Sequence, residues 1–131
     1  MVRFLTRHAT AGLASVVVLI GIAATSAHAD DVAAGKTVFA SQCSLCHSNG
    51  RNGAVILGPP LYGVIGRKAG TVNGFAYSTA MKTAGFVWTP ERLRAYLPGP
   101  RDYLPGVRMN YSGLKNPSQI EVLIAYLGSL K

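Results

Sequence analysis

The pentapeptide Cys43-Ser44-Leu45-Cys46-His47 decides how this sequence is interpreted. Cys43 and Cys46 are the only cysteines among the 131 residues. Of the three histidines, His8 and His28 lie within the first thirty residues, so His47 is the only one in the rest of the chain. Any thiol or imidazole chemistry of that remaining part therefore depends on these five residues.

The first thirty residues have the layout of a secretory leader. Two arginines precede an uncharged apolar run that ends in the small-x-small triplet Ala27-His28-Ala29. This pattern predicts cleavage after Ala29 and export from a bacterial cytoplasm to the periplasm. It divides the chain into a leader, 1–29, and one domain, 30–131.

An uncleaved membrane anchor is the alternative interpretation of the same segment. Residues 8–29 carry no Asp, Glu, Lys or Arg and are long enough to span a bilayer. Cleavage is favoured because the run is rich in Ala, Ser and Thr, and because a helix is predicted to begin at Asp31. That start leaves no linker to hold a domain away from a membrane.

The size and charge of the exported part restrict its function. A chain of 102 residues builds one modest core and is too short for a barrel or dinucleotide-binding enzyme. Without Arg3 and Arg7 it has 11 Lys and Arg against five Asp and Glu, a net charge of about +6. No long run of basic residues is present, so this charge indicates docking on acidic protein surfaces and not nucleic-acid binding.

Most kinds of catalytic or metal site do not fit this inventory. Structural zinc takes four Cys or His ligands, and only three are available. A Cys-His nucleophile needs partners from elsewhere in the chain, and neither a phosphate-binding loop nor a convincing pair of carboxylates is visible. A disulfide or thioredoxin-like pair would suit an exported chain, but the flanking sequence lacks the strand pattern of that fold.

Covalent haem attachment is the chemistry that the pentapeptide predicts. Two thiols three positions apart can add to the two vinyl groups of haem, and the adjacent histidine is then held over the iron. The same cofactor would also complete the core. The predicted helices start at Asp31, Ser78, Thr89 and Asn116, and they are joined by long Gly- and Pro-rich loops that need something to pack against.

The sequence resembles the class I cytochromes c, the group of mitochondrial cytochrome c and bacterial cytochrome c2. The resemblance covers 31–130, and the family implies an all-α, single-domain fold of three to five helices with long loops around one covalent haem c. The segments that carry it are Gly35-Lys-Thr-Val-Phe39, Cys43-Ser-Leu-Cys-His47, Gly58-Pro-Pro-Leu-Tyr-Gly63, Gly66-Arg-Lys-Ala-Gly70, Tyr77-Ser78, Gly85-Phe-Val-Trp88, Tyr96-Leu97, Tyr103-Leu-Pro-Gly-Val-Arg-Met109 and Ala125-Tyr-Leu127.

Two methionines outside the leader compete for the second axial position on the iron. Met81 falls in a predicted short helix, whereas Met109 follows Pro105-Gly106 in a loop, where a sulfur can face a flat ring. The resemblance implies that His47 and Met109 are the iron ligands and that Met81 is a packing residue. Family members often carry polar residues in place of Met81 and Val107.

The resemblance also implies which residues surround the haem. The Pro59 carbonyl would accept a hydrogen bond from the axial histidine, and Tyr96 would lie near the methionine sulfur. A buried haem propionate would be held by Arg67, Tyr77, Ser78 and Trp88. Gly35 and Phe39 would contact Tyr126 where the first and last helices meet.

A monomeric one-electron carrier with no catalytic residues is the function that follows. The resemblance implies a bc1-type complex or a periplasmic dehydrogenase as electron donor, and a terminal oxidase or a reaction centre as acceptor. The candidate docking cations are Lys68, Arg101, Arg108 and Lys115, and Tyr111 would lie at the exposed haem edge. A haem enzyme with an open iron, either peroxidase-like or gas-binding, is the alternative.

Overall fold

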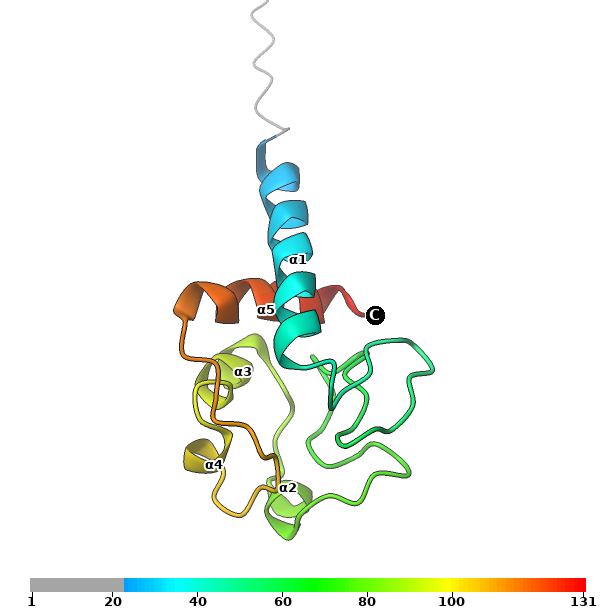
Figure 1. Ribbon diagram of the computed structural model, residues 1–131. Coiled ribbons are helices and arrows are strands. Elements are labelled where there is room, and N and C mark those ends of the chain that lie inside the picture. Colours follow the sequence, from blue (N-terminus) through cyan, green and yellow to red (C-terminus); the bar gives the residue numbers. More distant parts are fainter. Residues whose placement is uncertain (1–22) are drawn as a thin grey trace, which may run out of the picture.

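A computed structural model describes residues 23–131, and this part of the chain is all α-helical with long connecting loops (Figure 1). Within it there are isolated bridges between His47 and Val55 and between Lys68 and Val87, but no strands. The predicted all-α class and helix number are confirmed. The helices are α1 (Ala23–Gln42), α2 (Thr79–Thr83), α3 (Pro90–Tyr96), α4 (Pro100–Tyr103) and α5 (Pro117–Ser129).

Three of the predicted helix starts are confirmed, each with a side-chain cap. The Ser78 hydroxyl accepts a hydrogen bond from the amide of Met81, and the Thr89 hydroxyl accepts one from the amide of Arg92. Asn116 accepts from the amides of both Ser118 and Gln119 at the start of α5. These caps satisfy first-turn N–H groups that have no partner within the helix.

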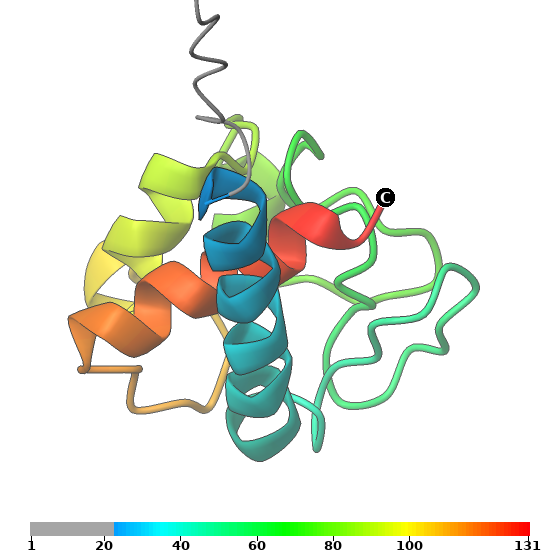
Figure 2. The ribbon, with the colours of Figure 1, turned by 90° about the horizontal axis from the view of Figure 1, so that it is seen from above.

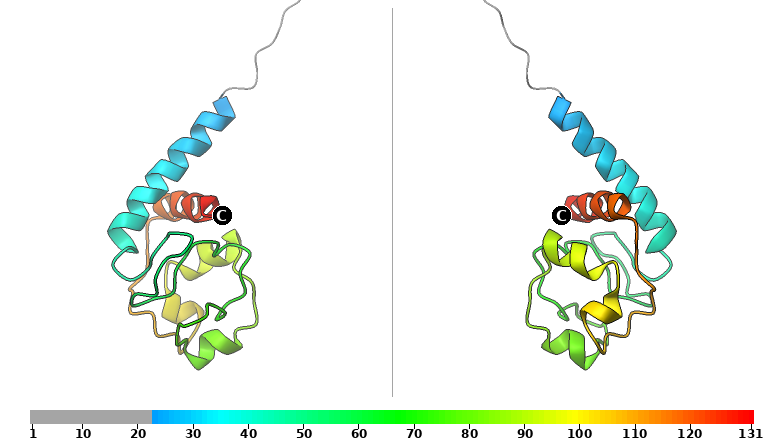
Figure 3. Two further views of the ribbon diagram at one scale, coloured as in Figure 1. Left: turned by 90° about the vertical axis from the view of Figure 1, so that its right-hand side faces the viewer. Right: turned by 90° about the vertical axis from the view of Figure 1, so that its left-hand side faces the viewer.

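The predicted cap at Asp31 is wrong, because α1 begins at Ala23 and Asp31 lies inside it. Residues 23–34 contain no Gly or Pro and six alanines, and alanine has the highest helix propensity. The helix therefore continues through the expected start and projects beyond the rest of the domain (Figure 3). The N-terminal part of the predicted leader, 1–22, lies outside the described residues. Within 23–131 no helix is both long and apolar enough to cross a bilayer.

A short helix, α4, was not predicted. The segment Pro98-Gly99-Pro100 ends α3 as expected, but Pro100 also occupies the first position of α4. Proline has no N–H to leave unpaired there, and its fixed φ suits a helix start. The same residue therefore separates two helices and begins the second.

The crossing of α1 and α5 forms one side of the core (Figure 2). Gly35 lies against α5, and the rings of Phe39 and Tyr126 meet with centroids 5.6 Å apart. The predicted apolar stripe of α5, Ile120, Leu123, Ile124 and Leu127, is buried. The contact expected between the first and last helices is thus confirmed.

Gly35→Ala should destabilise the domain by about 1–3 kcal/mol, because the added methyl group has no space. A Cβ at this position would lie 1.9 Å from the carbonyl oxygen of Val122 and 2.6 Å from the Cβ of Tyr126. Gly50→Ala is the matched control, since a Cβ there meets nothing within 4 Å, and its effect should stay within about 0.5 kcal/mol. Guanidinium unfolding followed by Trp88 fluorescence measures both; equal midpoints would show that the helices can move apart freely.

Candidate haem-binding site

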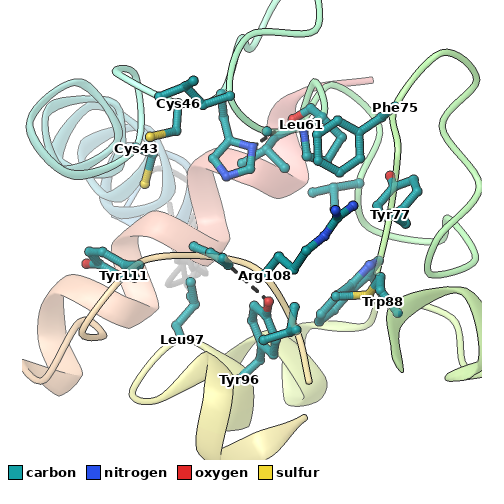
Figure 4. Close-up of a pocket in the computed structure, with 18 of the residues that line it drawn as sticks. Cys43, Cys46, Leu61, Phe75, Tyr77, Trp88, Tyr96, Leu97, Arg108 and Tyr111 are labelled. Carbon is teal, nitrogen blue, oxygen red and sulfur yellow. Dashed lines mark hydrogen bonds between the residues drawn. The ribbon is translucent and has the colours of Figure 1, made fainter. Parts of the chain in front are cut away.

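A cavity of about 740 Å³ lies between the helices and the long loops, and its walls are mostly apolar (Figure 4). The lining comes from the end of α1, from α2, α3 and α5, and from the loops before α2 and α5. All of the predicted site residues line it: Cys43, Cys46, His47, Pro59, Arg67, Tyr77, Ser78, Trp88, Tyr96 and Met109. Residues 66 positions apart are therefore brought to one site by the fold.

The two cysteines lie on the turn that follows α1, next to each other in Figure 4. The amides of Cys46 and His47 both donate to the carbonyl of Cys43, at 3.0 and 2.9 Å. Both thiols are free, and burial together with the neighbouring Cys46 raises the pKa of Cys43 to about 11. The turn thus presents a protonated thiol at position 43 and an imidazole to the same cavity.

His47 is oriented by a hydrogen bond on the side of the ring that carries Nδ1. This nitrogen lies 2.7 Å from the Pro59 carbonyl oxygen, which can only accept, so Nδ1 carries the proton. Burial lowers the pKa of His47, which favours the neutral ring. Nε2 is then left with a free lone pair and has no hydrogen-bond partner among residues 23–131. This is the protonation state that metal ligation requires.

Gly58 makes room for that ring. A Cβ at position 58 would lie 2.4 Å from Cε1 of His47, closer than side chains approach each other. The amide of Gly58 donates to the carbonyl of Cys46 at 2.8 Å, which fixes this backbone beside the imidazole. The imidazole is therefore packed against the backbone of Gly58, and its orientation is fixed by the hydrogen bond to the Pro59 carbonyl.

Met109 enters the cavity from the loop between α4 and α5, after the turn at Pro105-Gly106. Gly106 has a φ of +90°, a conformation that other residues adopt only with strain. The hydroxyl of Tyr96 lies 3.5 Å from Met109 Sδ and donates to it (dashed in Figure 4). Burial raises the pKa of Tyr96 to about 12, so the hydroxyl keeps its proton at physiological pH.

Met81 lines the same cavity but has a different setting. It lies on α2, it is 6 % exposed, and within residues 23–131 its sulfur accepts no hydrogen bond. It belongs to the buried apolar cluster with Trp88 and Leu93. The two methionines therefore have different surroundings. Met109 lies on a loop and accepts a hydrogen bond, whereas Met81 is enclosed by the core.

The predicted propionate partners all line the cavity. The Arg67 guanidinium donates to the carbonyls of Tyr62 and Pro60, at 3.0 and 2.9 Å, and burial lowers its pKa. Burial raises the pKa of Tyr77, and a hydrogen bond with the Val72 backbone and the charge of Arg67 offset only part of this rise. The ring of Trp88 packs edge-on against that of Tyr96 with centroids 4.9 Å apart.

Several lining residues were not predicted as part of the site. Arg108, expected only as a docking cation, lines the cavity and donates to the carbonyl of Ala76, joining the loops before α2 and before α5. Lys68, Arg101 and Lys115 do not line it. The apolar wall residues Leu61, Phe75 and Leu97 also line the cavity, and the sequence assigned no role at the site to any of them.

The residues present fit a covalently attached haem. The volume of about 740 Å³ lies within the range of ~300–1,000 Å³ that is usual for cofactor sites. The lining is mostly apolar with a small number of polar groups, which is also typical of such sites. The neutral imidazole, packed against Gly58, and the two adjacent thiols could serve as one axial ligand and two attachment points. In residues 23–131 no cluster of three His, Cys, Asp or Glu side chains could hold a bare metal ion.

Comparison with known proteins agrees with this site. Residues 32–131 match the family model described as Cytochrome c. Cytochrome c of Trypanosoma brucei brucei is 50 % identical over 82 residues, which cover 63 % of this chain and 85 % of the relative. Cytochrome c2 of Blastochloris viridis is 44 % identical over 101 residues, covering 77 % and 79 %, and cytochrome c of Euglena viridis is 44 % identical over 101 residues, covering 77 % and 98 %.

The family match spans all the described residues from Val32 onward, including the two cysteines and the entire cavity. It favours an electron carrier over the alternatives of a disulfide oxidoreductase and of a haem enzyme. The chain therefore belongs to the cytochrome c family, as an electron carrier, not an enzyme, that holds one covalent haem c.

Proposed function

We propose that His47 and Met109 are the two axial ligands of the haem iron and that Cys43 and Cys46 form its thioether bonds. The observation that carries this proposal is the polar partner given to each ligand. The Pro59 carbonyl fixes Nδ1 of His47 at 2.7 Å, and the Tyr96 hydroxyl lies 3.5 Å from Met109 Sδ. Each partner leaves the opposite lone pair of its ligand available to a metal.

The haem supplies the one-electron couple, and the chain sets its potential and its access to solvent. A thioether ligand favours the ferrous state, and so does the apolar wall, because enclosure disfavours the additional charge of the ferric state. With both axial positions filled by His47 and Met109, no coordination site would remain open for oxygen or peroxide. The hydrogen bond from the Tyr96 hydroxyl would help to orient the Met109 sulfur toward the iron.

We propose that the buried haem propionate is held by four residues: Arg67, Tyr77, Ser78 and Trp88. Arg67 uses Nη1 and Nη2 on backbone carbonyls and retains further N–H groups, since a guanidinium has five donors. The Ser78 hydroxyl accepts from an amide and still has its own proton to donate. A buried carboxylate needs such donors and a nearby cation.

The cellular role proposed for the protein is that of a periplasmic shuttle, released by cleavage after Ala29. Its donor would be a bc1-type complex or a periplasmic dehydrogenase, and its acceptor a terminal oxidase or a reaction centre. The excess of basic residues supports docking on acidic surfaces of such complexes. The intact mass of the exported protein, compared with residues 30–131 plus one haem, checks the cleavage.

Electron transfer to an acidic partner should slow as salt is added, because the docking cations are exposed and screened. Raising the ionic strength from about 0.01 to 0.15 M shortens the Debye length from ~30 to ~8 Å, and the bimolecular rate should fall by about tenfold. The measurement is stopped-flow oxidation of the reduced protein by the purified terminal oxidase of the same organism. A rate indifferent to salt would contradict electrostatic docking, and no oxidation by the oxidase, together with no reduction by the bc1-type complex, would contradict the proposed role.

A further inference from the structure

The first part of α1 lies outside the packed domain. Residues 28–31 are all exposed, and within residues 28–42 the first side chain that packs against the core is that of Val32. Gly35 is buried against α5 a little further along the helix. The helix therefore consists of an extension that projects from the domain (Figure 3) and a part, from Val32 onward, that the core holds.

Two aspartates lie where the extension meets the packed part. Within residues 23–131, Asp30 and Asp31 make no side-chain hydrogen bond and no ion pair, and the first turn of α1 contains no acidic residue. Aspartate is a poor helix former inside a helix, but it is one of the best residues at an N-cap. The pair is therefore placed unfavourably in the helix as it stands and would suit a helix that began here.

Cleavage after Ala29 would create such a start. Hydrolysis adds water across the peptide bond between Ala29 and Asp30, so Ala29 leaves with a new carboxylate and the nitrogen of Asp30 becomes an α-amino group. The carbonyls of residues 26–29 leave with the leader. In α1 they accept from the amides of residues 30–33, since each amide of an α-helix bonds four residues back. The shortened helix thus has amides without acceptors at its new end.

We propose that this cleavage converts Asp31 from an interior residue of α1 into its N-cap. The Asp31 carboxylate then accepts hydrogen bonds from the amides of Ala33 and Ala34, the second and third residues of the shortened helix. Its negative charge lies at the positive end of the helix dipole, where the new α-amino group of Asp30 is unfavourable. Packing selects this position, because the core holds the helix only from Val32 onward.

The inference rests on the cleavage after Ala29 that is part of the proposed function, and it adds what the cut does to the domain. Residues 28–31 do not belong to the core, so removing the segment up to Ala29 takes no packed side chain away. The hydrogen bonds that leave with the leader are replaced by those of the cap. The contact between α1 and α5 at Gly35 therefore stays intact while the end of the helix changes.

The test compares the same substitutions in processed and unprocessed holoprotein. The variants are Asp31→Ala, Asp31→Asn, which removes the charge but keeps an oxygen that caps about as well, and Asp30→Ala as the matched control. The unprocessed form is made with Ala29→Gln, which removes the small residue needed for cleavage and keeps a good helix former. Both forms are kept in the same mild detergent, and intact mass establishes where each chain begins.

In the processed protein, Asp31→Ala should lower the folding equilibrium constant by about fivefold, while Asp31→Asn and Asp30→Ala should stay within about twofold of the wild type. In the unprocessed protein the sign should reverse, with Asp31→Ala raising the constant by about two- to threefold, because alanine is the better residue inside a helix. Guanidinium unfolding gives these constants. Hydrogen exchange of the Ala33 and Ala34 amides should be faster in Asp31→Ala only in the processed protein.

Two results would overturn the cap and leave the electron-carrier function intact. One is an equal effect of Asp31→Ala in the two forms, whether a loss or no change, and the other is a loss in the processed protein that appears for Asp30→Ala instead. A mature chain that begins at a residue other than Asp30 would contradict the proposed cleavage, and the inference would fall with it. The intact mass separates this last result from the first two.

Discussion

His47→Ala and Cys43→Ala should each lower the yield of stable exported holoprotein by at least about tenfold. Without the cofactor the chain would have to close or hydrate a cavity of about 740 Å³. At ~24 cal/mol per Å³ of cavity, such a volume corresponds to on the order of 10–20 kcal/mol. That cost is as large as the entire stability of a typical domain, ~5–15 kcal/mol.

The two substitutions act through different bonds. Cys43→Ala removes one covalent attachment, and the remaining thioether leaves the ring less fixed. His47→Ala removes the proposed iron ligand, whose ring packs against Gly58 and is hydrogen-bonded to the Pro59 carbonyl. Both variants should therefore be degraded during export or recovered with little haem.

Ser44→Ala is the matched control for both variants. It lies on the same turn, its side chain is exposed, and its hydroxyl makes one hydrogen bond, to the Ala40 carbonyl. Its holoprotein yield should stay close to that of the wild type. Yields are measured as covalent haem per chain after denaturing electrophoresis, together with the visible spectrum. A His47→Ala protein recovered in full, with the spectrum of a six-coordinate haem, would contradict the assignment of this ligand.

The helix starts show where local sequence is sufficient. Ser78, Thr89 and Asn116 were predictable because a cap acts on N–H groups two or three residues away, and both partners lie within one short segment. Asp31 has the same chemistry but follows a stretch that is itself strongly helical. A capping residue marks a helix start only when the residues before it do not continue the helix.

The candidate site shows the same division. The attachment turn is predictable because its chemistry needs three residues within one pentapeptide. The residues of the cavity wall are not predictable in this way, because Phe75 and Leu97 contribute apolar area that many other residues could have supplied. Arg108 illustrates the remaining difficulty. Sequence indicates a solvated cation, and only the fold brings it against the carbonyl of Ala76.

Met109→Ala should open the haem iron to external ligands, while Met81→Ala should not. With the sulfur removed, the reduced protein should bind carbon monoxide at neutral pH, and the wild type should not. The potential of Met109→Ala should also fall by on the order of 0.1 V, because axial ligands are a main determinant of haem potentials. The measurements are a carbon monoxide titration of the reduced spectrum and a redox titration.

Met81→Ala separates loss of a ligand from loss of packing, because both sulfurs line the same cavity. The Met81 side chain is 6 % exposed within the buried cluster, so truncation should cost about 2–5 kcal/mol of stability. Carbon monoxide should still be excluded, since Met109 and its hydrogen bond from Tyr96 are untouched. Met109→Ala should thus change the coordination and the potential of the haem iron, whereas Met81→Ala should change the unfolding midpoint. If Met81→Ala opened the iron and Met109→Ala left it closed, the axial position would belong to α2, and the loop after Pro105-Gly106 would have only a structural role.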